Sequence, residues 1–269
     1  MEDSFIQIEN CAQSGIGVYA VFHGYDGASS AQYSSGYITE SIRKQIKSFV
    51  LNRGSDTELD AQKMLADIIV ATESRLKKQI EKGTHNSGTT CTIAIAEKNR
   101  LTVANVGNSH AVLCKMNGQA EELSNSTIGM ESIEEALEET FEEPPEFPQQ
   151  KYKMPLLRSL GSKPFKEHFN VIPTPEIRTF DFGLMAENKP SFMILASDRL
   201  WDRFSSQEAV NFIKNGDMKP QYEDFGAPEL VDVAHDLGSC DTISVLTVVF
   251  NNGLYEVKSN HDSYVWSRH

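Results

Sequence analysis

Apolar residues recur at helical spacing in two long segments of the first third of the chain. These segments run from about Ala31 to Leu51 and from about Ala61 to Lys82. The apolar positions are Ile38, Ile42, Ile46 and Phe49 in the first segment and Leu65, Ile68, Ile69, Thr72, Leu76 and Ile80 in the second. Because these positions fall three or four residues apart, we predict two amphipathic helices.

Alternating and continuous apolar runs predict strands in other parts of the chain. The run VYAVF at 18–22 leads into a glycine-bracketed turn, HGYDG. Between residues 89 and 124, apolar runs flank the turn EKNR and the hairpin signal Asn117-Gly118, so we expect a β-meander there. Further strands are expected at 171–182, 191–196 and 241–250.

Two shorter helices are expected in the last third of the chain. One begins near Ser205, where Glu208 follows three residues later as in a capping box, and the other runs from about Pro228 to Leu237. The polar residues from about Lys258 onward are expected to fray. The order of strands and helices indicates a layered fold of helices with antiparallel sheets.

Composition and charge narrow the class of protein. The 269 residues are 39% hydrophobic and 23% charged, which is typical of a soluble globular chain with one large domain. The formal net charge of -13 argues against binding to nucleic acid or to an anionic membrane surface. No apolar run approaches the roughly 20 residues that are needed to span a bilayer. We therefore expect neither a nucleic-acid nor a membrane partner.

The N-terminus and the cysteines bear on the cellular compartment. The start MEDSFIQIEN lacks the basic region of a secretory signal. The four cysteines are scattered and form no CxxC pair, which favours reduced, buried thiols over disulfides or structural zinc. We expect a cytoplasmic or nuclear protein.

Much of the negative charge lies in the segment 121–150, which we interpret as an acidic insertion. No Lys or Arg occurs between Lys115 and Lys151, and ten glutamates fall there. Ile133, Leu137 and Phe141 predict a short amphipathic helix within it. The segment is either a solvated surface lid or a helix that docks in a partner's groove.

Several acidic residues stand at the ends of expected strands. Glu2 and Asp3 precede the first apolar run, Asp198 follows SFMILAS, and Asp241 opens the last strand. If these carboxylates converge, they form an oxygen-rich site suited to Mg²⁺ or Mn²⁺. The alternative is that each is an ordinary turn residue.

The sequences around these acids resemble one protein family in chain order. The matching stretches are MED, VYAVFHGYDG, SGTTC, LTVANVGNSHAVLCKMNGQAEELS, LLRSLGSKPFK, VIPTPEI, FMILASDRLWDRFSSQEAVNFI and DTISVLTVVF. They are similar to the signatures of the metal-dependent protein phosphatases, the PPM or type-2C family, and run from Met1 to Phe250.

This resemblance implies an α+β fold, a PPM-type β-sandwich of two antiparallel sheets flanked by α-helices. We expect a single domain over residues 1–257, with a polar tail at 258–269. The family's first strand, with an arginine that holds the substrate phosphate, lies upstream of MED. We expect either that both are missing from the protein or that the sequence is truncated before them.

The resemblance also implies a site. Family members hold two Mn²⁺ or Mg²⁺ ions, and a bridging hydroxide attacks phosphoserine or phosphothreonine. Glu2, Asp198 and Asp241 match carboxylates that hold one metal, and Asp3 matches the second acid of MED. Gly24 matches a glycine whose carbonyl reaches the other metal. These five residues are our candidate metal ligands.

Several matched family positions carry a different residue here. His23 replaces the aspartate that bridges both metals, and a neutral imidazole offers one lone pair where a carboxylate offers two oxygens and a charge. Tyr25 replaces a histidine proposed as the general acid, and with an ordinary pKa of about 10 it is a poor proton donor. Asn108 replaces an aspartate associated with an additional metal, and Ser162 replaces the aspartate of LGD.

Arg199 is a further departure, because it replaces the glycine of SDGLWD and adds a long cation beside Asp198. Strand and core signatures remain while the chemical groups change. We therefore interpret the protein as a monomeric pseudophosphatase that binds a protein partner, such as a kinase or a phosphoprotein, and retains at most one weak Mn²⁺ or Mg²⁺ site. The alternative is an active Ser/Thr phosphatase with a site rebuilt from Glu2, His23, Asp198 and Asp241.

Overall fold

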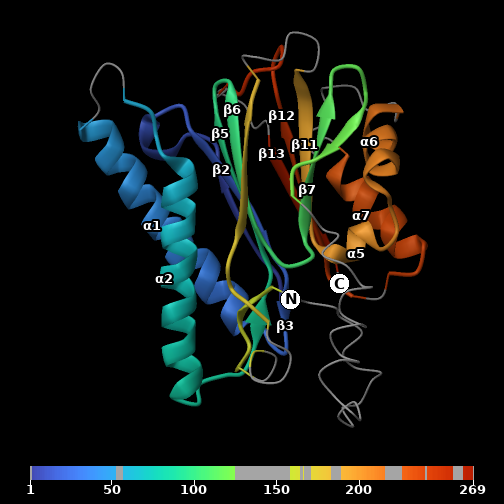
Figure 1. Cartoon of the computed structure of the whole chain (residues 1–269). Coiled ribbons are helices and arrows are strands. Elements are labelled where there is room, and N and C mark those ends of the chain that lie inside the picture. Colours follow the sequence, from blue (N-terminus) through green and yellow to red (C-terminus); the bar gives the residue numbers. More distant parts are fainter. Residues whose placement is uncertain are drawn as a thin grey trace, which may run out of the picture.

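Two antiparallel five-stranded sheets lie between two groups of helices in the computed structural model (Figure 1). The structure describes residues 2–52, 57–124, 158–163, 166, 171–182, 189–215, 226–239 and 241–256, and the backbone of 263–268. The predicted acidic helix lies outside the described residues. The expected sandwich of two antiparallel sheets flanked by helices is confirmed.

The first sheet has the strand order β1-β2-β5-β6-β10, and every neighbouring pair is antiparallel. Its strands are β1 (Ser4–Ile8), β2 (Gly17–Phe22), β5 (Cys91–Glu97), β6 (Arg100–Val106) and β10 (Glu176–Asp181). The second sheet has the order β13-β12-β11-β7-β8. Its strands are β7 (His110–Lys115), β8 (Ala120–Glu122), β11 (Pro190–Ala196), β12 (Ile243–Val249) and β13 (Ser263–Arg268).

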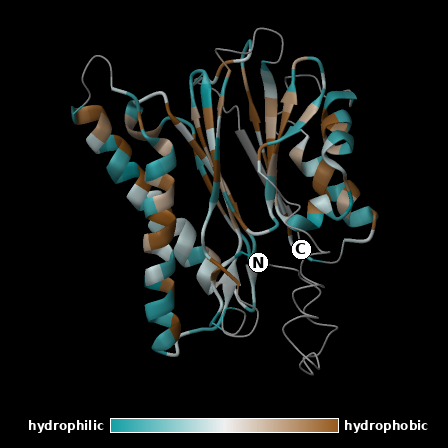
Figure 2. Cartoon of the chain, in the orientation of Figure 1, coloured by the Kyte–Doolittle hydropathy of each residue, from teal (hydrophilic) through white to brown (hydrophobic). Residues whose placement is uncertain are grey.

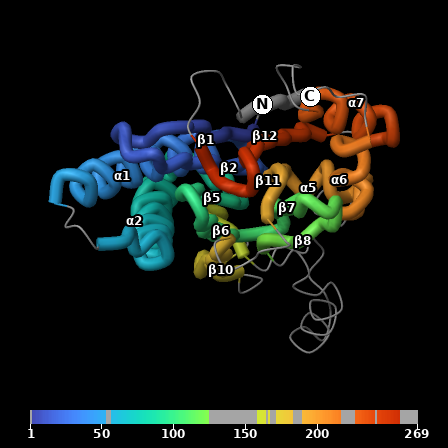
Figure 3. The backbone as a smooth tube through the Cα atoms, turned by 90° about the horizontal axis from the view of Figure 1, so that it is seen from above, coloured from blue at the N-terminus to red at the C-terminus, as the bar shows by residue number. Residues whose placement is uncertain are grey.

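The helices cover the outer faces of the two sheets (Figure 3). The first sheet is covered by α1 (Ser29–Asn52) and α2 (Ala61–Glu81), and the second by α5 (Asp198–Trp201), α6 (Ser206–Asn215) and α7 (Ala227–Asp236). A 3-10 helix, η1 (Cys11–Gln13), links β1 to β2. None of the helices among the described residues is both long and apolar enough for a membrane span.

Side chains on the two faces of β2 pack into two different hydrophobic cores. Val18, Ala20 and Phe22 pack with the apolar faces of α1 and α2, whereas Tyr19 and Val21 pack between the two sheets. Successive residues of a strand point to opposite faces, so one strand serves two cores. A third core lies under α6 and α7, and brown stripes on the helices of Figure 2 mark the apolar residues.

The helix predictions are confirmed with small shifts at the ends. Asp60 caps α2 by accepting a hydrogen bond from the Lys63 backbone amide, at 2.9 Å. The capping box at α6 is formed, because the Glu208 carboxylate accepts hydrogen bonds from both the amide and the hydroxyl of Ser205. Cys11, Cys91 and Cys114 are free and buried, as expected for reduced thiols. Cys240 lies outside the described residues.

Two sequence predictions about strands are wrong. Residues 89–124 form no continuous meander, because β5 and β6 pair in the first sheet whereas β7 and β8 pair in the second. The chain crosses between sheets through Gly107, whose φ of 113° is accessible mainly to glycine. The tail does not fray throughout, because the backbone of 263–268 pairs with β12. An edge strand offers unpaired backbone groups, and a following segment can satisfy them.

A third, small sheet was not predicted. It consists of β3 (Gly24–Tyr25), β4 (Gly88–Thr89) and β9 (Leu160–Gly161), in the order β3-β4-β9. Strands of two residues are too short to show any periodicity. This sheet lies at the same end of the sandwich as the beginning of α1 (Figure 1).

Candidate functional site

The candidate residues come together where four strands begin or end. Asp3 immediately precedes β1 and His23 immediately follows β2, and the antiparallel pairing of Ser4 with Phe22 places them side by side. Asp198 opens α5 just after β11, and Asp241 lies just before β12. Asp3, Asp198 and Asp241 therefore lie close together at one end of the sandwich, whereas the Glu2 side chain is exposed.

His23 lies between two buried carboxylates. Its Nδ1 is 2.8 Å from Oδ1 of Asp3, and its Nε2 is 3.6 Å from Oδ1 of Asp198. The imidazole is only 3% exposed. Its backbone is fixed by β4 and the residue after it, because the Thr89 hydroxyl and the Thr90 amide both donate to the His23 carbonyl oxygen. The ring is therefore held in place from both sides.

The acidic surroundings change the protonation of His23. Burial lowers the pKa of the imidazole, but the hydrogen bond with Asp3 and the charges of Asp198, Asp3 and Asp241 outweigh burial and raise the pKa to about 9. Burial raises the pKa of Asp198, and the charges of His23 and Arg199 oppose that rise. At neutral pH, His23 is therefore an imidazolium, in which both ring nitrogens carry a proton and no lone pair remains for a metal.

The second oxygen of each buried carboxylate accepts a hydrogen bond from another side chain. Ser244 donates its hydroxyl to Oδ2 of Asp3 at 2.7 Å, and Asn108 donates its amide to Oδ2 of Asp198 at 3.1 Å. Asn108 is thus drawn into the site, as its place in the sequence suggested. Its own Oδ1 is buried and has no hydrogen-bond partner among the described residues.

Arg199 binds the outer part of the same cluster. Its Nη2 is 3.3 Å from Oδ2 of Asp241, its Nη1 is 3.3 Å from Oδ2 of Asp202, and its Nε is 4.0 Å from Oδ1 of Asp198. The Arg199 side chain is 28% exposed and lies between the buried Asp198 and the half-exposed Asp202 and Asp241. The guanidinium fork can contact several carboxylates at once because its donors lie in one plane.

Gly24 and Glu2 meet through their backbones. A Cβ atom on Gly24 would overlap the carbonyl oxygen of Glu2, so only glycine fits this approach. The Glu2 side chain is exposed. The roles of Glu2 and Gly24 as metal ligands stay predictions.

Tyr25 and Ser162 lie in a separate polar group around the third sheet. The Tyr25 hydroxyl donates to Oγ of Ser159 at 2.8 Å, and the backbone amide of Ser162 donates to the Ser87 carbonyl oxygen. Its ring fills the space over Gly88, where any side chain would overlap it. Burial raises the pKa of Tyr25 to about 12. The phenol is therefore engaged with Ser159 and holds its proton firmly.

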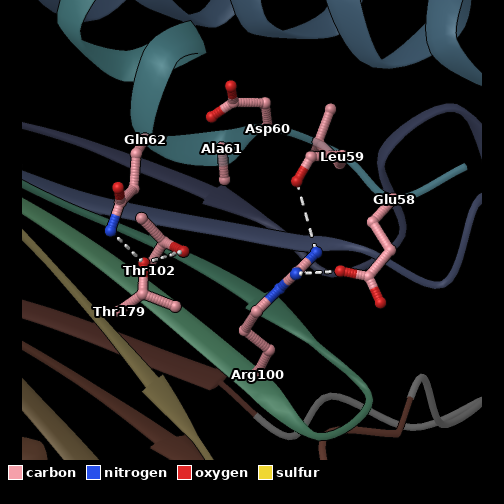
Figure 4. A pocket seen from close by; sticks show the side chains of 8 residues that line it. All are labelled: Glu58, Leu59, Asp60, Ala61, Gln62, Arg100, Thr102 and Thr179. Atoms are coloured by element: carbon pink, nitrogen blue, oxygen red, sulfur yellow. Dashed lines mark hydrogen bonds and ion pairs between the residues drawn. The ribbon is translucent and has the colours of Figure 1, made fainter.

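Two surface cavities lie away from these candidate residues. Cavities of about 320 and 510 Å³ open near the start of α2, at the opposite end of the sandwich from β3 (Figures 1 and 4). In the smaller one, Arg100 bonds the Glu58 carboxylate and the Leu59 carbonyl oxygen, and Gln62 reaches Thr179. Arg100 is the cation among the described residues that line this cavity, and it is already paired.

The arrangement does not fit the pair of metal ions that the family resemblance implies. Asp3 is bound to His23 and Ser244, Asp198 is bound to Asn108 and faces His23, and Asp241 is bound to Arg199. In the part of the chain that the structure describes, no group of three or more His, Cys, Asp or Glu side chains is placed to hold a metal ion. We therefore assign no chemical step to a metal here.

Sequence reasoning missed two members of the cluster. Ser244 lies on β12, and its contact with Asp3 joins residues 241 positions apart, which only the sheet register reveals. Asp202 follows Asp198 by four residues, so helical spacing could have placed both on one face of α5.

Comparison with known proteins identifies the family. The family described as Protein phosphatase 2C matches residues 1–131 and 151–243. The chain belongs to the protein phosphatase 2C family. It is similar to Protein phosphatase 1L of Bos taurus, with 33% identity over 256 residues, covering 94% of this chain and 69% of that protein. It is also similar to Probable protein phosphatase 2C 71 of Arabidopsis thaliana, with 30% identity, covering 93% of this chain and 52% of that protein.

Solved structures show the same fold as this PP2C-family chain. The serine-threonine phosphatase 2C from Toxoplasma gondii aligns with a TM-score of 0.69 at 18% identity, over 93% of this chain and 90% of that one. A C. elegans sex determining protein aligns with a TM-score of 0.67 at 19% identity, over 95% of this chain and 61% of that one. At these identities the likeness concerns the fold alone.

Proposed function

We propose that this PP2C-family protein is a pseudophosphatase that binds a protein partner in Ser/Thr phosphorylation signalling. The observation that carries the proposal is the position of His23 between Asp3 and Asp198, with its ring nitrogens 2.8 and 3.6 Å from their oxygens. A protonated imidazole at this position neutralises the charge of the Asp3 and Asp198 carboxylates with a side chain of the protein itself. It cannot act as an anionic bridge between cations.

The remaining groups support the same conclusion. Two-metal hydrolysis requires free carboxylate oxygens, because the cations activate water and neutralise the phosphate. Here Arg199 binds Asp241 as well, and Tyr25 directs its proton to Ser159. A general acid must release its proton near the working pH. The raised pKa of Tyr25, about 12, opposes that release.

The proposed partner is a kinase or a phosphoprotein, because these are the proteins that act in Ser/Thr phosphorylation signalling. The net charge of -13 gives the protein no general attraction for nucleic acid.

An active phosphatase with a rebuilt site is the alternative. Its supporting observation is that Asp3, Asp198 and Asp241 do converge. For this alternative, one metal ion would have to displace Arg199 or His23 from these acids.

A manganese-dependent phosphatase assay separates the two functions. We would measure phosphate release from a phosphothreonine peptide by the wild type, His23→Asp and Asp198→Asn, beside an active PP2C enzyme. We expect no release above buffer from any of the three. His23→Asp alone should remain inactive because Tyr25 and Arg199 are unchanged. Robust hydrolysis by the wild type that Asp198→Asn abolishes would establish the active alternative.

The same preparation tests the binding role. Binding to a kinase or phosphoprotein partner should be equally tight in Mn²⁺ and in EDTA, since the acids are neutralised by the chain itself. A partner that binds only when Mn²⁺ is added would contradict the pseudophosphatase proposal.

A further inference from the structure

We propose that Arg199 is a tethered cation that closes the acid cluster of Asp198, Asp202 and Asp241 to divalent metal ions. Removal of its guanidinium would then leave carboxylate oxygens of Asp198 and Asp241 free to bind one Mn²⁺ together with water. This inference rests on the proposed function and adds to it the residue that keeps metal out.

The contacts of Arg199 place its charge among these oxygens. Its two terminal nitrogens each lie 3.3 Å from a carboxylate oxygen, one of Asp241 and one of Asp202, and Nε lies 4.0 Å from Asp198. Arg199 and two of these acids belong to or directly follow α5, while Asp241 comes from the segment before β12. The guanidinium therefore joins two segments that are far apart in the sequence.

A buried carboxylate oxygen of Asp198 near Arg199 lacks a hydrogen-bond donor, which indicates a position where a cation could bind. Oδ1 of Asp198 is buried and accepts no hydrogen bond from any described residue, and Asp198 as a whole is 6% exposed. Among the described residues, Nε2 of His23, at 3.6 Å, and Nε of Arg199, at 4.0 Å, lie nearest this oxygen as basic groups. A buried carboxylate oxygen without a hydrogen bond is rare, and a cation is the group that would satisfy it.

Arg199 and a metal ion would compete for the same oxygens. Mn²⁺ and Mg²⁺ bind carboxylate oxygens directly, at roughly 2.0–2.2 Å. A guanidinium 3.3 Å from Asp241 already covers that approach, and its charge repels a second cation at short range. Only one of the two can neutralise the cluster at a time.

The chain offers a matched control at Arg203. This residue follows Arg199 by four positions and donates to the Gly238 carbonyl oxygen at 3.1 Å. It is exposed, and its guanidinium bonds a neutral acceptor. Arg203→Ala therefore removes the same charge from the same region without uncovering Asp198 or Asp241.

The experiment measures Mn²⁺ binding by isothermal titration and by the shift in thermal unfolding temperature. The proteins are the wild type, Arg199→Ala, Arg199→Lys and Arg203→Ala. We expect Arg199→Ala to bind one Mn²⁺ at least tenfold more tightly than the wild type and to gain thermal stability from it. Arg199→Lys keeps a cation and should behave like the wild type, as should Arg203→Ala. Asp241→Asn added to Arg199→Ala should remove the new binding.

The outcomes separate this inference from the proposed function. If Arg199→Ala folds poorly without metal, Arg199→Gln keeps most of the side chain and is measured in the same way. The inference would be overturned if the wild type and the Arg199→Ala or Arg199→Gln variant bound Mn²⁺ with equal affinity. A wild type without phosphatase activity would still be consistent with the proposed function. Metal-dependent phosphatase activity of the wild type would instead overturn the proposed function.

Discussion

His23 and Arg199 both place a basic side chain in the candidate site. The family resemblance places a carboxylate and a glycine at these positions, and the chain places two cations there. The convergence of Asp3, Asp198 and Asp241 could be predicted from motif matches alone. The ion-pair and hydrogen-bond partners of these acids could not be predicted, because they depend on which side chains face each other in the folded protein.

A second buried histidine, His110, makes the stability of the folded protein depend on pH. His110 is 5% exposed and stacks on Trp201 with ring centroids 4.1 Å apart. Burial lowers its pKa to about 4, although the charge of Glu122 and a hydrogen bond with the Asn108 backbone oppose this. In the unfolded chain the pKa is about 6.5. Between pH 6.5 and pH 4, the imidazole of His110 is therefore protonated in the unfolded state and neutral in the folded state.

We expect this histidine to destabilise the folded protein progressively as the pH falls from 6.5 to 4. The loss of unfolding free energy reaches up to about 3 kcal/mol by linkage. His110→Phe keeps an aromatic ring against Trp201 and removes the titration. Urea unfolding of both proteins at several pH values gives the comparison. The free energy of unfolding of the wild type should fall by up to about 3 kcal/mol relative to that of His110→Phe between pH 7 and pH 4, and parallel curves would contradict the assignment.

Elements were predictable where a pattern repeats over several turns or residues. The apolar faces of α1 and α2 fixed both helices, and the capping box fixed the start of α6. The sheet to which β7 belongs was not predictable, because alternation marks a strand's faces and says nothing about its neighbours. The strand β13 was missed because its partner, β12, supplies the backbone bonds that order it.

The capping box of α6 predicts a measurable contribution to stability. The Ser205 hydroxyl accepts from the Glu208 amide at 3.3 Å and donates to its carboxylate at 2.7 Å. Ser205→Ala should lower the free energy of unfolding by about 1 kcal/mol. Ser74→Ala, an exposed serine in the middle of α2, is the control and should change it by less than about 0.5 kcal/mol. Chemical denaturation measures both, and equal effects would argue against a functioning cap.

At the scale of the whole molecule, the sandwich brings residues from both ends of the chain to one site. Asp3 and Ser244 are hydrogen-bonded although 241 positions separate them. Family membership and the layered fold followed from ordered motifs over most of the chain. The central claim concerns what neutralises the acids at this end of the sandwich: cations that belong to the chain, His23 and Arg199, in place of bound metal.

A crystal structure of the wild type grown in Mn²⁺, with anomalous scattering recorded at the manganese edge, tests this claim most directly. The account predicts that His23 lies within hydrogen-bonding distance of Asp3, that Arg199 contacts Asp241, and that no pair of anomalous peaks lies between these acids. Two closely spaced Mn²⁺ ions over Gly24, with Asp198 and Asp241 turned toward them, would contradict it.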